Sequence, residues 1–133
     1  MQTEELDLDR TGRRLVDLTS EAVRFCAGTA DGLLHVFAPH ATAGLALIET
    51  GAGSEEDLLT VLERLLPRDD RYVHAHGAVG HGADHVLPAI VCPFLAIPVL
   101  GGEPALGTWQ RIVLVDLNTD NPRRRVRLSL LPA

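Results

Sequence analysis

Short apolar segments of strand length, separated by glycine- and proline-containing turns, occupy both ends of the chain and limit its possible folds more than any other feature. Three of them follow one another in the C-terminal third, with only turns between them. Strands that succeed one another without helices pair most simply as antiparallel neighbours. The expected strands cover residues 3–9, 14–18, 33–38, 44–49, 94–100, 108–117 and 124–130.

Helical patterns lie between these strands. The first predicted helix begins at Thr19 and ends before Gly28, with small polar residues at its start and glycine at its end. In the second, leucines recur at helical spacing between Ser54 and Pro67. Ser54 and Asp57 resemble a capping box, in which the serine side chain would accept hydrogen bonds from the first turn.

A third, shorter helix is expected over residues 83–91, where Pro88 would strain it or delay its start. Strands that bracket two or three helices without strict alternation predict an α+β fold with a mostly antiparallel sheet. At 133 residues the chain is the size of one domain, so we expect residues 1–133 to form a single domain.

Composition excludes several classes of function. The formal net charge is −6, which disfavours binding to nucleic acid through phosphate contacts. All 12 basic residues are arginines, so neither Schiff-base chemistry nor a P-loop lysine is available. The longest apolar runs fall far short of the roughly 20 residues of a membrane span, and the acidic N-terminus has no apolar leader. We therefore expect a cytoplasmic protein with Cys26 and Cys92 buried and reduced.

Four of the six histidines fall within the twelve residues 74–85, HAHGAVGHGADH. Imidazole is the commonest side-chain ligand for metals. His74 and His76 would share one face of a strand, and His81 and His85 one face of a helix. The HExxH zinc motif is absent. Spacing alone leaves two interpretations open: a metal site and a solvated loop that titrates near neutral pH.

A fifth histidine, His40, follows the predicted strand over residues 33–38, and strand ends are where loops gather and sites form. Three histidines drawn from separate elements, with one position left for water or substrate, are typical of catalytic zinc. His35 lies in the middle of that strand, and we expect it to be packed or at a sheet edge.

The segments PHATAGLALIET (39–50), LGTWQ (106–110) and NPRRR (121–125), with the spacing of eleven between His74 and His85, together resemble the YjbQ family. Members of that family are described as secondary thiamine-phosphate synthases. The resemblance extends from about residue 15 to the C-terminus, and LGTWQ is its most specific motif. It implies an α+β fold, a homotrimer and a divalent metal, zinc being the metal that histidine ligands suit.

The resemblance also implies roles for individual residues. The metal ligands would be His40, His74 and His85, the catalytic residues Thr42, Glu49, Trp109 and Gln110, and the phosphate-binding residue Arg123. His76 and His81 are further candidate ligands because both lie between His74 and His85 in the sequence.

The activity implied is a transferase reaction of thiamine biosynthesis. It joins hydroxymethylpyrimidine diphosphate to thiazole phosphate and releases pyrophosphate. Two alternatives remain open: a non-catalytic trimer that binds a metal or a phosphorylated metabolite, and a zinc-dependent hydrolase. The second alternative arises because histidines suit zinc, whereas diphosphate chemistry usually employs magnesium on carboxylates. Each interpretation involves a small molecule, with no nucleic acid and no membrane as partner.

Overall fold

Eleven elements make up the computed structural model, which describes residues 1–133. The strands are β1 (Gln2–Asp9), β2 (Leu15–Asp17), β3 (Gly32–Phe37), β4 (Gly44–Ile48), β5 (Phe94–Leu100), β6 (Glu103–Pro104), β7 (Arg111–Val115) and β8 (Arg123–Pro132). The helices are α1 (Thr19–Cys26), α2 (Ser54–Leu65) and α3 (His81–Ile90). The α+β fold predicted from the sequence is confirmed.

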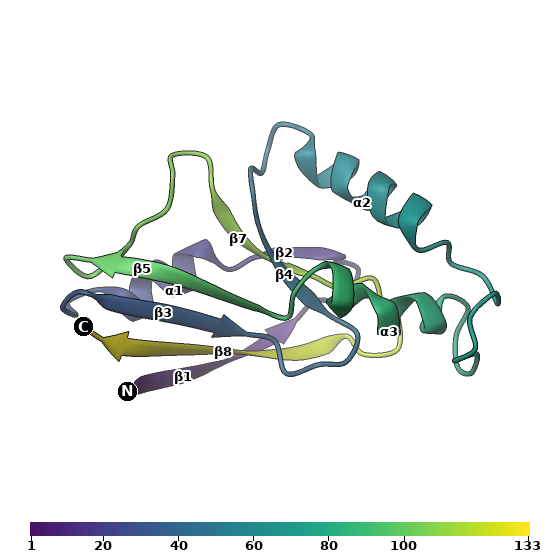
Figure 1. Cartoon of the computed structure of the whole chain (residues 1–133), viewed down its shortest axis with the longest axis horizontal. Helices are drawn as coiled ribbons and strands as arrows, with labels where there is room; N and C mark the ends of the chain where they lie inside the picture. The colour runs from purple at the N-terminus through teal and green to yellow at the C-terminus, as the bar shows by residue number, and fades with distance from the viewer.

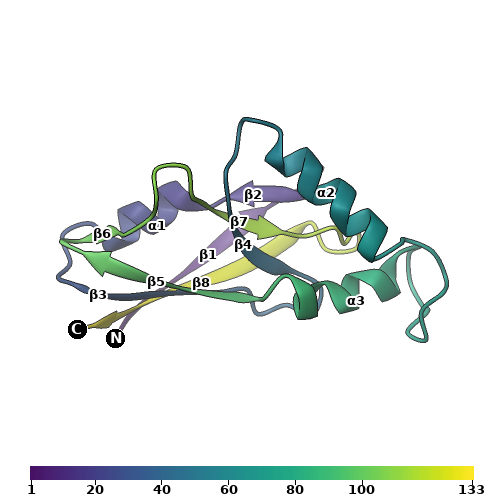
Figure 2. The ribbon, with the colours of Figure 1, turned by 45° about the horizontal axis from the view of Figure 1, so that its top comes forward.

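Every strand pair is antiparallel, in two sheets. The larger sheet has the order β1-β8-β3-β5-β6 and the smaller the order β2-β7-β4. Figures 1 and 2 show α2 and α3 towards one end of the molecule, with α1 and both chain termini towards the other. In the larger sheet the first strand, β1, pairs with the last, β8, and Gln2 lies opposite Leu130.

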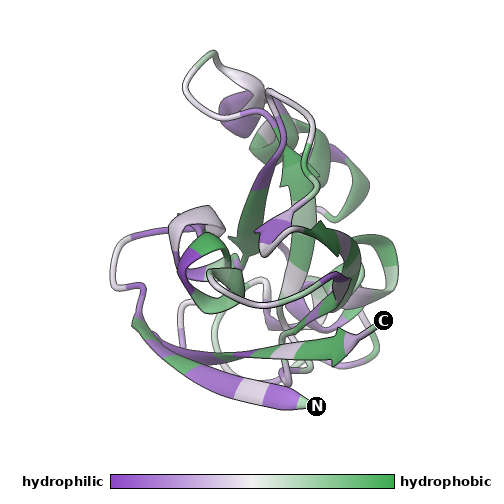
Figure 3. Cartoon of the chain, turned by 90° about the vertical axis from the view of Figure 1, so that its left-hand side faces the viewer, coloured by the Kyte–Doolittle hydropathy of each residue, from purple (hydrophilic) through white to green (hydrophobic).

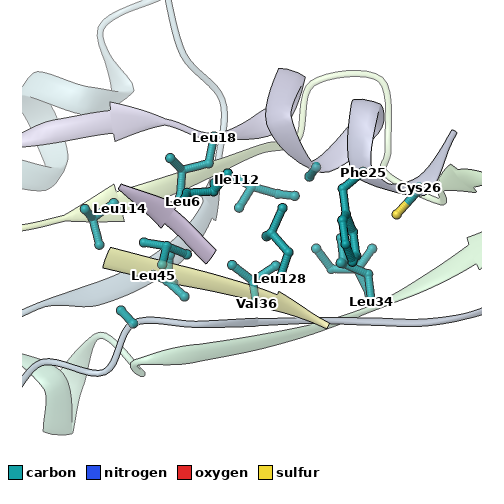
Figure 4. Packing of buried hydrophobic residues seen from close by; sticks show 14 of the residues in the cluster. Leu6, Leu18, Phe25, Cys26, Leu34, Val36, Leu45, Ile112, Leu114 and Leu128 are labelled. Atoms are coloured by element: carbon teal, nitrogen blue, oxygen red, sulfur yellow. The ribbon is translucent and has the colours of Figure 1, made fainter. Parts of the chain in front are cut away.

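The main hydrophobic core lies between the larger sheet and the layer formed by α1 and the smaller sheet. Figure 4 shows Phe25 pointing from α1 toward Leu34 of β3, with Ile112 and Leu128 beside them. Strand residues alternate between this core and the outside, as the two-residue period of a strand requires. In Figure 3 the strand that begins at the N-terminus is largely hydrophilic, because its outward residues are acidic.

A second, smaller cluster holds α2 and α3 against the other face of the smaller sheet. Leu62 of α2 and Leu87 of α3 pack there with Val115, the last residue of β7. Because β7 contributes Ile112 and Leu114 to the main core and Val115 to this cluster, both of its faces are covered. The position of α3, which carries His81 and His85, is fixed by this packing.

Several local expectations need correction. The second helix is not capped by Ser54: Gly53, at a φ of 100°, turns the chain into the helix, and Ser54 is already its first residue. Three acidic residues in the first turn of α2 instead face the positive end of the helix dipole. The third helix begins at His81 rather than at residue 83. Cys26 is buried as expected, but Cys92 is exposed because it lies in the turn before β5.

A buried ion cluster stands where β7 ends. Asp116 is fully buried, and Arg124 donates to its carboxylate through Nε and, at 3.3 Å, through Nη2. The second nitrogen also donates to Thr42 Oγ1 at 2.7 Å. Arg10 Nε lies 2.7 Å from Asp116 Oδ2, the same oxygen that Arg124 Nε contacts. A carboxylate removed from water in this way is tolerated only because it is paired.

We predict that Asp116→Asn destabilises the fold severely, because it leaves two buried guanidinium groups without a counter-charge. The free energy of unfolding should fall by about 3–5 kcal/mol, the usual consequence of removing one partner of a buried pair. Urea unfolding followed by circular dichroism measures it. Asp17→Asn is the matched control, since Asp17 pairs with the half-exposed Arg111 at 2.9 Å, and its loss should stay below about 1 kcal/mol. Equal losses in the two variants would contradict this account of Asp116.

Candidate functional site

Three histidines converge where the loop over residues 66–80 meets α3. His81 and His85 lie four residues apart and therefore share one face of the helix. His74, on the loop, places its ring centroid 4.4 Å from that of His85 and 5.1 Å from that of His81. One ring nitrogen from each of the three lies within 4.8 Å of the other two. His74 and His85, both predicted ligands, are thus brought together, and His81 joins them.

The hydrogen bonds of His81 direct one of its nitrogens toward the cluster. Its Nδ1 lies 3.2 Å from Asp120 Oδ2, the arrangement by which carboxylates orient metal-binding histidines. Its Nε2 lies 3.1 Å from His85 Nε2. Two nitrogens on one tetrahedral zinc ion, each at 2.0–2.1 Å, stand roughly 3.3–3.4 Å apart. The spacing in the structure is close to that value.

Asn118 connects Asp120, the hydrogen-bond partner of His81, to helix α3. Its Oδ1 accepts a hydrogen bond from the Asp120 backbone N–H at 3.0 Å, and its Nδ2 donates to Asp84 Oδ2 at 2.9 Å. Asp84 is buried and also paired with Arg68. The carboxylate that orients His81 is therefore connected to a buried network that includes α3 itself.

Gly82 allows the loop to approach the helix. A Cβ at this position would lie 2.5 Å from Tyr72 Cβ and 2.6 Å from the His74 carbonyl oxygen, both closer than atoms tolerate. Any larger residue would push away the segment that carries His74. The glycines between the histidines thus have a packing role.

His76 contacts the cluster without joining the group of three. Its ring centroid lies 4.3 Å from that of His74 and 4.6 Å from that of His81. Burial, and then the neighbouring rings of His74 and His81, lower the pKa of His85 from its ordinary value of 6.5. A lowered pKa favours the neutral imidazole, which is the form that binds metal.

His40 is not among the three histidines that converge at α3, so the structure does not bring His40, His74 and His85 together as one group. His40 Nε2 lies 3.0 Å from the Arg125 backbone N, which can donate to it. The register between β3 and β8 places His40 beside Arg125. Phe37 of β3 pairs with Arg127 of β8, so the chain beyond β3 continues alongside the start of β8. Helix α3, which carries His81 and His85, instead packs on the smaller sheet.

Two other predicted residues gather near His40. His40 and Arg123 line one hollow of about 580 Å³, whose remaining lining residues are Glu5, Asp7, Arg124 and Arg125. Thr42 is buried beneath it and accepts the hydrogen bond from Arg124. Arg123 is exposed and lies 3.0 Å from Asp7. All six lining residues are charged or titratable, so the hollow is suited to a charged ligand.

The remaining predicted residues lie apart from both places. Trp109 is 71% exposed in the turn before β7, and Gln110 Oε1 accepts a hydrogen bond from the Gly107 N–H at 2.8 Å within that turn. Glu49 is exposed just after β4. None of the three lines the hollow at His40 or contacts the histidines at α3.

Sequence reasoning missed the residues that support the cluster. Asp116, Asn118 and Asp120 alternate with other residues directly after a strongly apolar strand, and the structure connects all three to buried partners or to His81. Polar residues that alternate after a buried strand were the available signal. Arg124, another residue that the sequence did not single out, is buried and paired with Asp116.

Fold and site together define a small α+β protein with two antiparallel sheets and a histidine cluster on the helix that covers the smaller one. The chain belongs to the UPF0047 family: the model of "UPF0047 protein YjbQ-like" matches residues 4–133. The resemblance stated from the sequence motifs is thereby confirmed.

Relatives agree with this assignment. A UPF0047 protein of Mycobacterium tuberculosis is 66% identical over 131 residues, 98% of each chain, and one of Archaeoglobus fulgidus is 35% identical over 87% of this chain and 90% of its own. The crystal structure of a hypothetical protein from Aeropyrum pernix has a TM-score of 0.88 at 32% identity over the whole of both chains. A YbjQ-like protein of unknown function from Sulfolobus solfataricus has the same fold, with a TM-score of 0.87 at 22% identity over 99% of this chain and 97% of its own. None of the three helices has the length and apolar character needed to cross a membrane.

His40 should make the fold sensitive to acid. Burial, and then the Arg124 charge, lower the pKa of His40 from its ordinary value of 6.5. The unfolded chain therefore binds this proton more readily than the folded one, so the stabilisation is complete above about pH 6.5 and is lost as pH falls through the lowered value. We predict a smaller drop in melting temperature between about pH 7 and 5 for His40→Gln than for the parent, both in EDTA. Parallel curves would contradict this role of His40.

Proposed function

We propose that this chain binds a divalent metal through His74, His81 and His85 and uses it in an enzymatic reaction on a phosphorylated small molecule. The observation that carries the proposal is the convergence of three ring nitrogens within 4.8 Å, one of them oriented by Asp120. This ligand set keeps the sequence-based expectation for His74 and His85 and exchanges His40 for His81.

The donor set favours zinc. Neutral imidazoles suit zinc and other transition metals, whereas magnesium prefers carboxylate and water oxygens. Three protein ligands leave a tetrahedral ion one position for water or substrate. His81 and His85 are held by the helix, and Gly82 allows the close approach of the His74 loop, so the ligands are positioned before any ion arrives.

The hollow at His40 is the proposed position for the substrate's phosphate. Arg123 and Arg125 point charged groups there, and their present partners are Asp7 at 3.0 Å and Glu5 at 3.1 Å. Exposed ion pairs of this kind contribute little, so a phosphate can replace them at small cost. Arginine binds phosphate in a bidentate geometry that lysine cannot copy.

The family resemblance suggests the reaction of a thiamine-phosphate synthase. The thiazole ring nitrogen forms a bond to the methylene carbon of the pyrimidine, and the bond from that carbon to the diphosphate oxygen breaks with its electron pair, so that pyrophosphate leaves. A metal held by His74, His81 and His85 would supply positive charge to neutralise the leaving diphosphate. Arg123 holds the phosphate of one substrate, and Thr42 fixes Arg124 beneath the same hollow.

The all-histidine donor set also favours a second candidate. Zinc lowers the pKa of its bound water to about 7, which is the basis of zinc-dependent hydrolysis. A hydrolase would use the same three ligands with a phosphate ester as substrate. The two reactions are distinguished by their products.

We further propose that three copies assemble around the outer face of β3 and β5. Leu33, Phe94 and Leu100 are exposed there, and His35 stacks between Phe37 and Phe94. A contiguous apolar surface of this kind is typical of an interface, and homo-oligomers form closed rings. The exposed Trp109, Gln110 and Glu49 would then be available to a neighbouring copy's site.

Sedimentation equilibrium tests the trimer. It should give three times the 14.3 kDa chain mass, and a 14.3 kDa species at all concentrations would contradict the trimer.

Zinc content tests the ligand set. We predict that His74→Ala, His81→Ala and His85→Ala each lose most of the zinc that the purified parent holds, while His35→Ala and His40→Ala keep it. Elemental analysis after dialysis is the measurement. If His40→Ala loses zinc and His81→Ala keeps it, the set implied by the resemblance is correct and ours is wrong. Metal should also leave as the pH falls, because protonated imidazoles do not bind it.

Turnover tests the reaction. Zinc-loaded protein, given hydroxymethylpyrimidine diphosphate and thiazole phosphate, should release pyrophosphate and form thiamine phosphate, and Arg123→Gln should raise KM by about tenfold or more, the scale of a charged hydrogen bond. Arg24→Gln is the control, because Arg24 pairs with Glu4, away from the hollow. Release of inorganic phosphate from either substrate alone would support the hydrolase, and metal binding without any turnover would support a non-catalytic protein.

A further inference from the structure

A second hollow, separate from the two places described above, lies between the turn after β1 and the segment after β7. It has a volume of about 310 Å³ and is lined by residues 10–14, 117–119 and 122. Three of the lining residues, Arg10, Arg13 and Arg14, are arginines, and none is acidic. The volume is at the lower end of the roughly 300–1,000 Å³ of small-molecule pockets.

Arg10 is the feature of this hollow that needs explanation. Its side chain is only 6% exposed. The terminal nitrogens donate to three backbone carbonyl oxygens: those of Arg13 at 3.1 Å, Asp116 at 3.4 Å and Asn118. Nε lies 2.7 Å from the Asp116 carboxylate but out of line for a hydrogen bond, and has no other partner. A buried guanidinium group is thus fixed chiefly by neutral oxygens.

The charges around Arg10 do not balance. Asp116 is the one carboxylate paired with Arg10, and it also accepts two hydrogen bonds from the buried Arg124. Two positive groups therefore share one negative group in a region of low dielectric constant, where an unbalanced charge is costly. Asp84 cannot supply the difference, since it is paired with Arg68.

Two acidic side chains, Asp9 and Glu63, lie near the rim without lining the hollow. The Asp9 carboxylate accepts hydrogen bonds from the backbone N–H and the hydroxyl of Thr11, at 3.0 and 2.6 Å. Glu63 approaches Arg14 at 3.4 Å, with both side chains more than half exposed. Such a contact is weak and replaceable. The residues that line the hollow therefore carry only positive charge, that of Arg10, Arg13 and Arg14.

We infer that this hollow binds a phosphate group, either as free inorganic phosphate or at the end of a small phosphorylated molecule. Arg10 supplies the buried charge that the anion balances, and Arg13 and Arg14 reach the same hollow from its rim. The site shares no lining residue with the hollow at His40, and it contains none of the histidines. It therefore does not rest on the proposed metal site or the proposed reaction.

The test uses inorganic phosphate as the ligand and protein freed of metal with EDTA, so that zinc plays no part. Isothermal calorimetry at constant ionic strength gives affinity and stoichiometry for the parent and for a double variant, Arg13→Gln with Arg14→Gln. Arg10 is left intact because its replacement risks unfolding the protein. Arg24→Gln is the control for the loss of an exposed, paired arginine.

The double variant should bind phosphate at this site at least about tenfold more weakly, since charged hydrogen bonds are lost, and Arg24→Gln should bind as the parent does. Arg123→Gln with Arg125→Gln separates the two hollows. If that pair removes all binding and the rim pair removes none, our inference is wrong and the proposed substrate site is supported. If the parent binds two phosphates and each pair removes one, both sites stand. No phosphate binding by the parent would overturn the inference and would leave the zinc experiment unaffected.

Discussion

The pairing of Asp116 with two buried arginines is the interaction on which the rest of the structure depends. Arg10 directly follows β1, Arg124 is the second residue of β8, and Asp116 directly follows β7. The cluster therefore joins the larger sheet to the smaller one at a single buried point. Hydrophobic packing alone does not specify a register between two sheets, whereas a buried carboxylate with fixed partners does.

The same cluster reaches the histidines through a short segment of chain. Two residues beyond Asp116, Asn118 bonds Asp84 in α3, and two further on, Asp120 contacts His81. The site is thus positioned from a polar network on one side and from the apolar contacts of Leu87 on the other. Because His81 and His85 lie on a helix packed in both ways, their spacing is set by the fold.

Most of the fold was predictable from local patterns, because turns and periodicity are local properties. The seven expected strands and the three helices all occur, with shifts of a few residues at their ends. The short β6 was not predicted, since two residues carry no periodic signal. Burial of Arg124 was also unpredictable, because nothing near it in the sequence indicates that Asp116 lies opposite.

The candidate site was only partly predictable, for a related reason. The grouping of His74, His81 and His85 follows from their closeness in sequence and from the helical spacing of the last two. The position of His40 depends on the pairing of β3 with β8, two strands separated by most of the chain. Long-range register of that kind decides which loops meet, and local sequence does not determine it.

The pairing of the first strand with the last has a consequence for biosynthesis. Asp9 lies opposite Arg123 and Gln2 opposite Leu130, so β1 has no partner until the C-terminal residues exist. The central β3 also waits for β8 on one side. During translation the first hundred residues therefore emerge with unpaired strand edges, which are prone to associate with other chains. Completion of the larger sheet is therefore a late event in folding, and its many long-range contacts make it slow compared with the closure of a helical bundle.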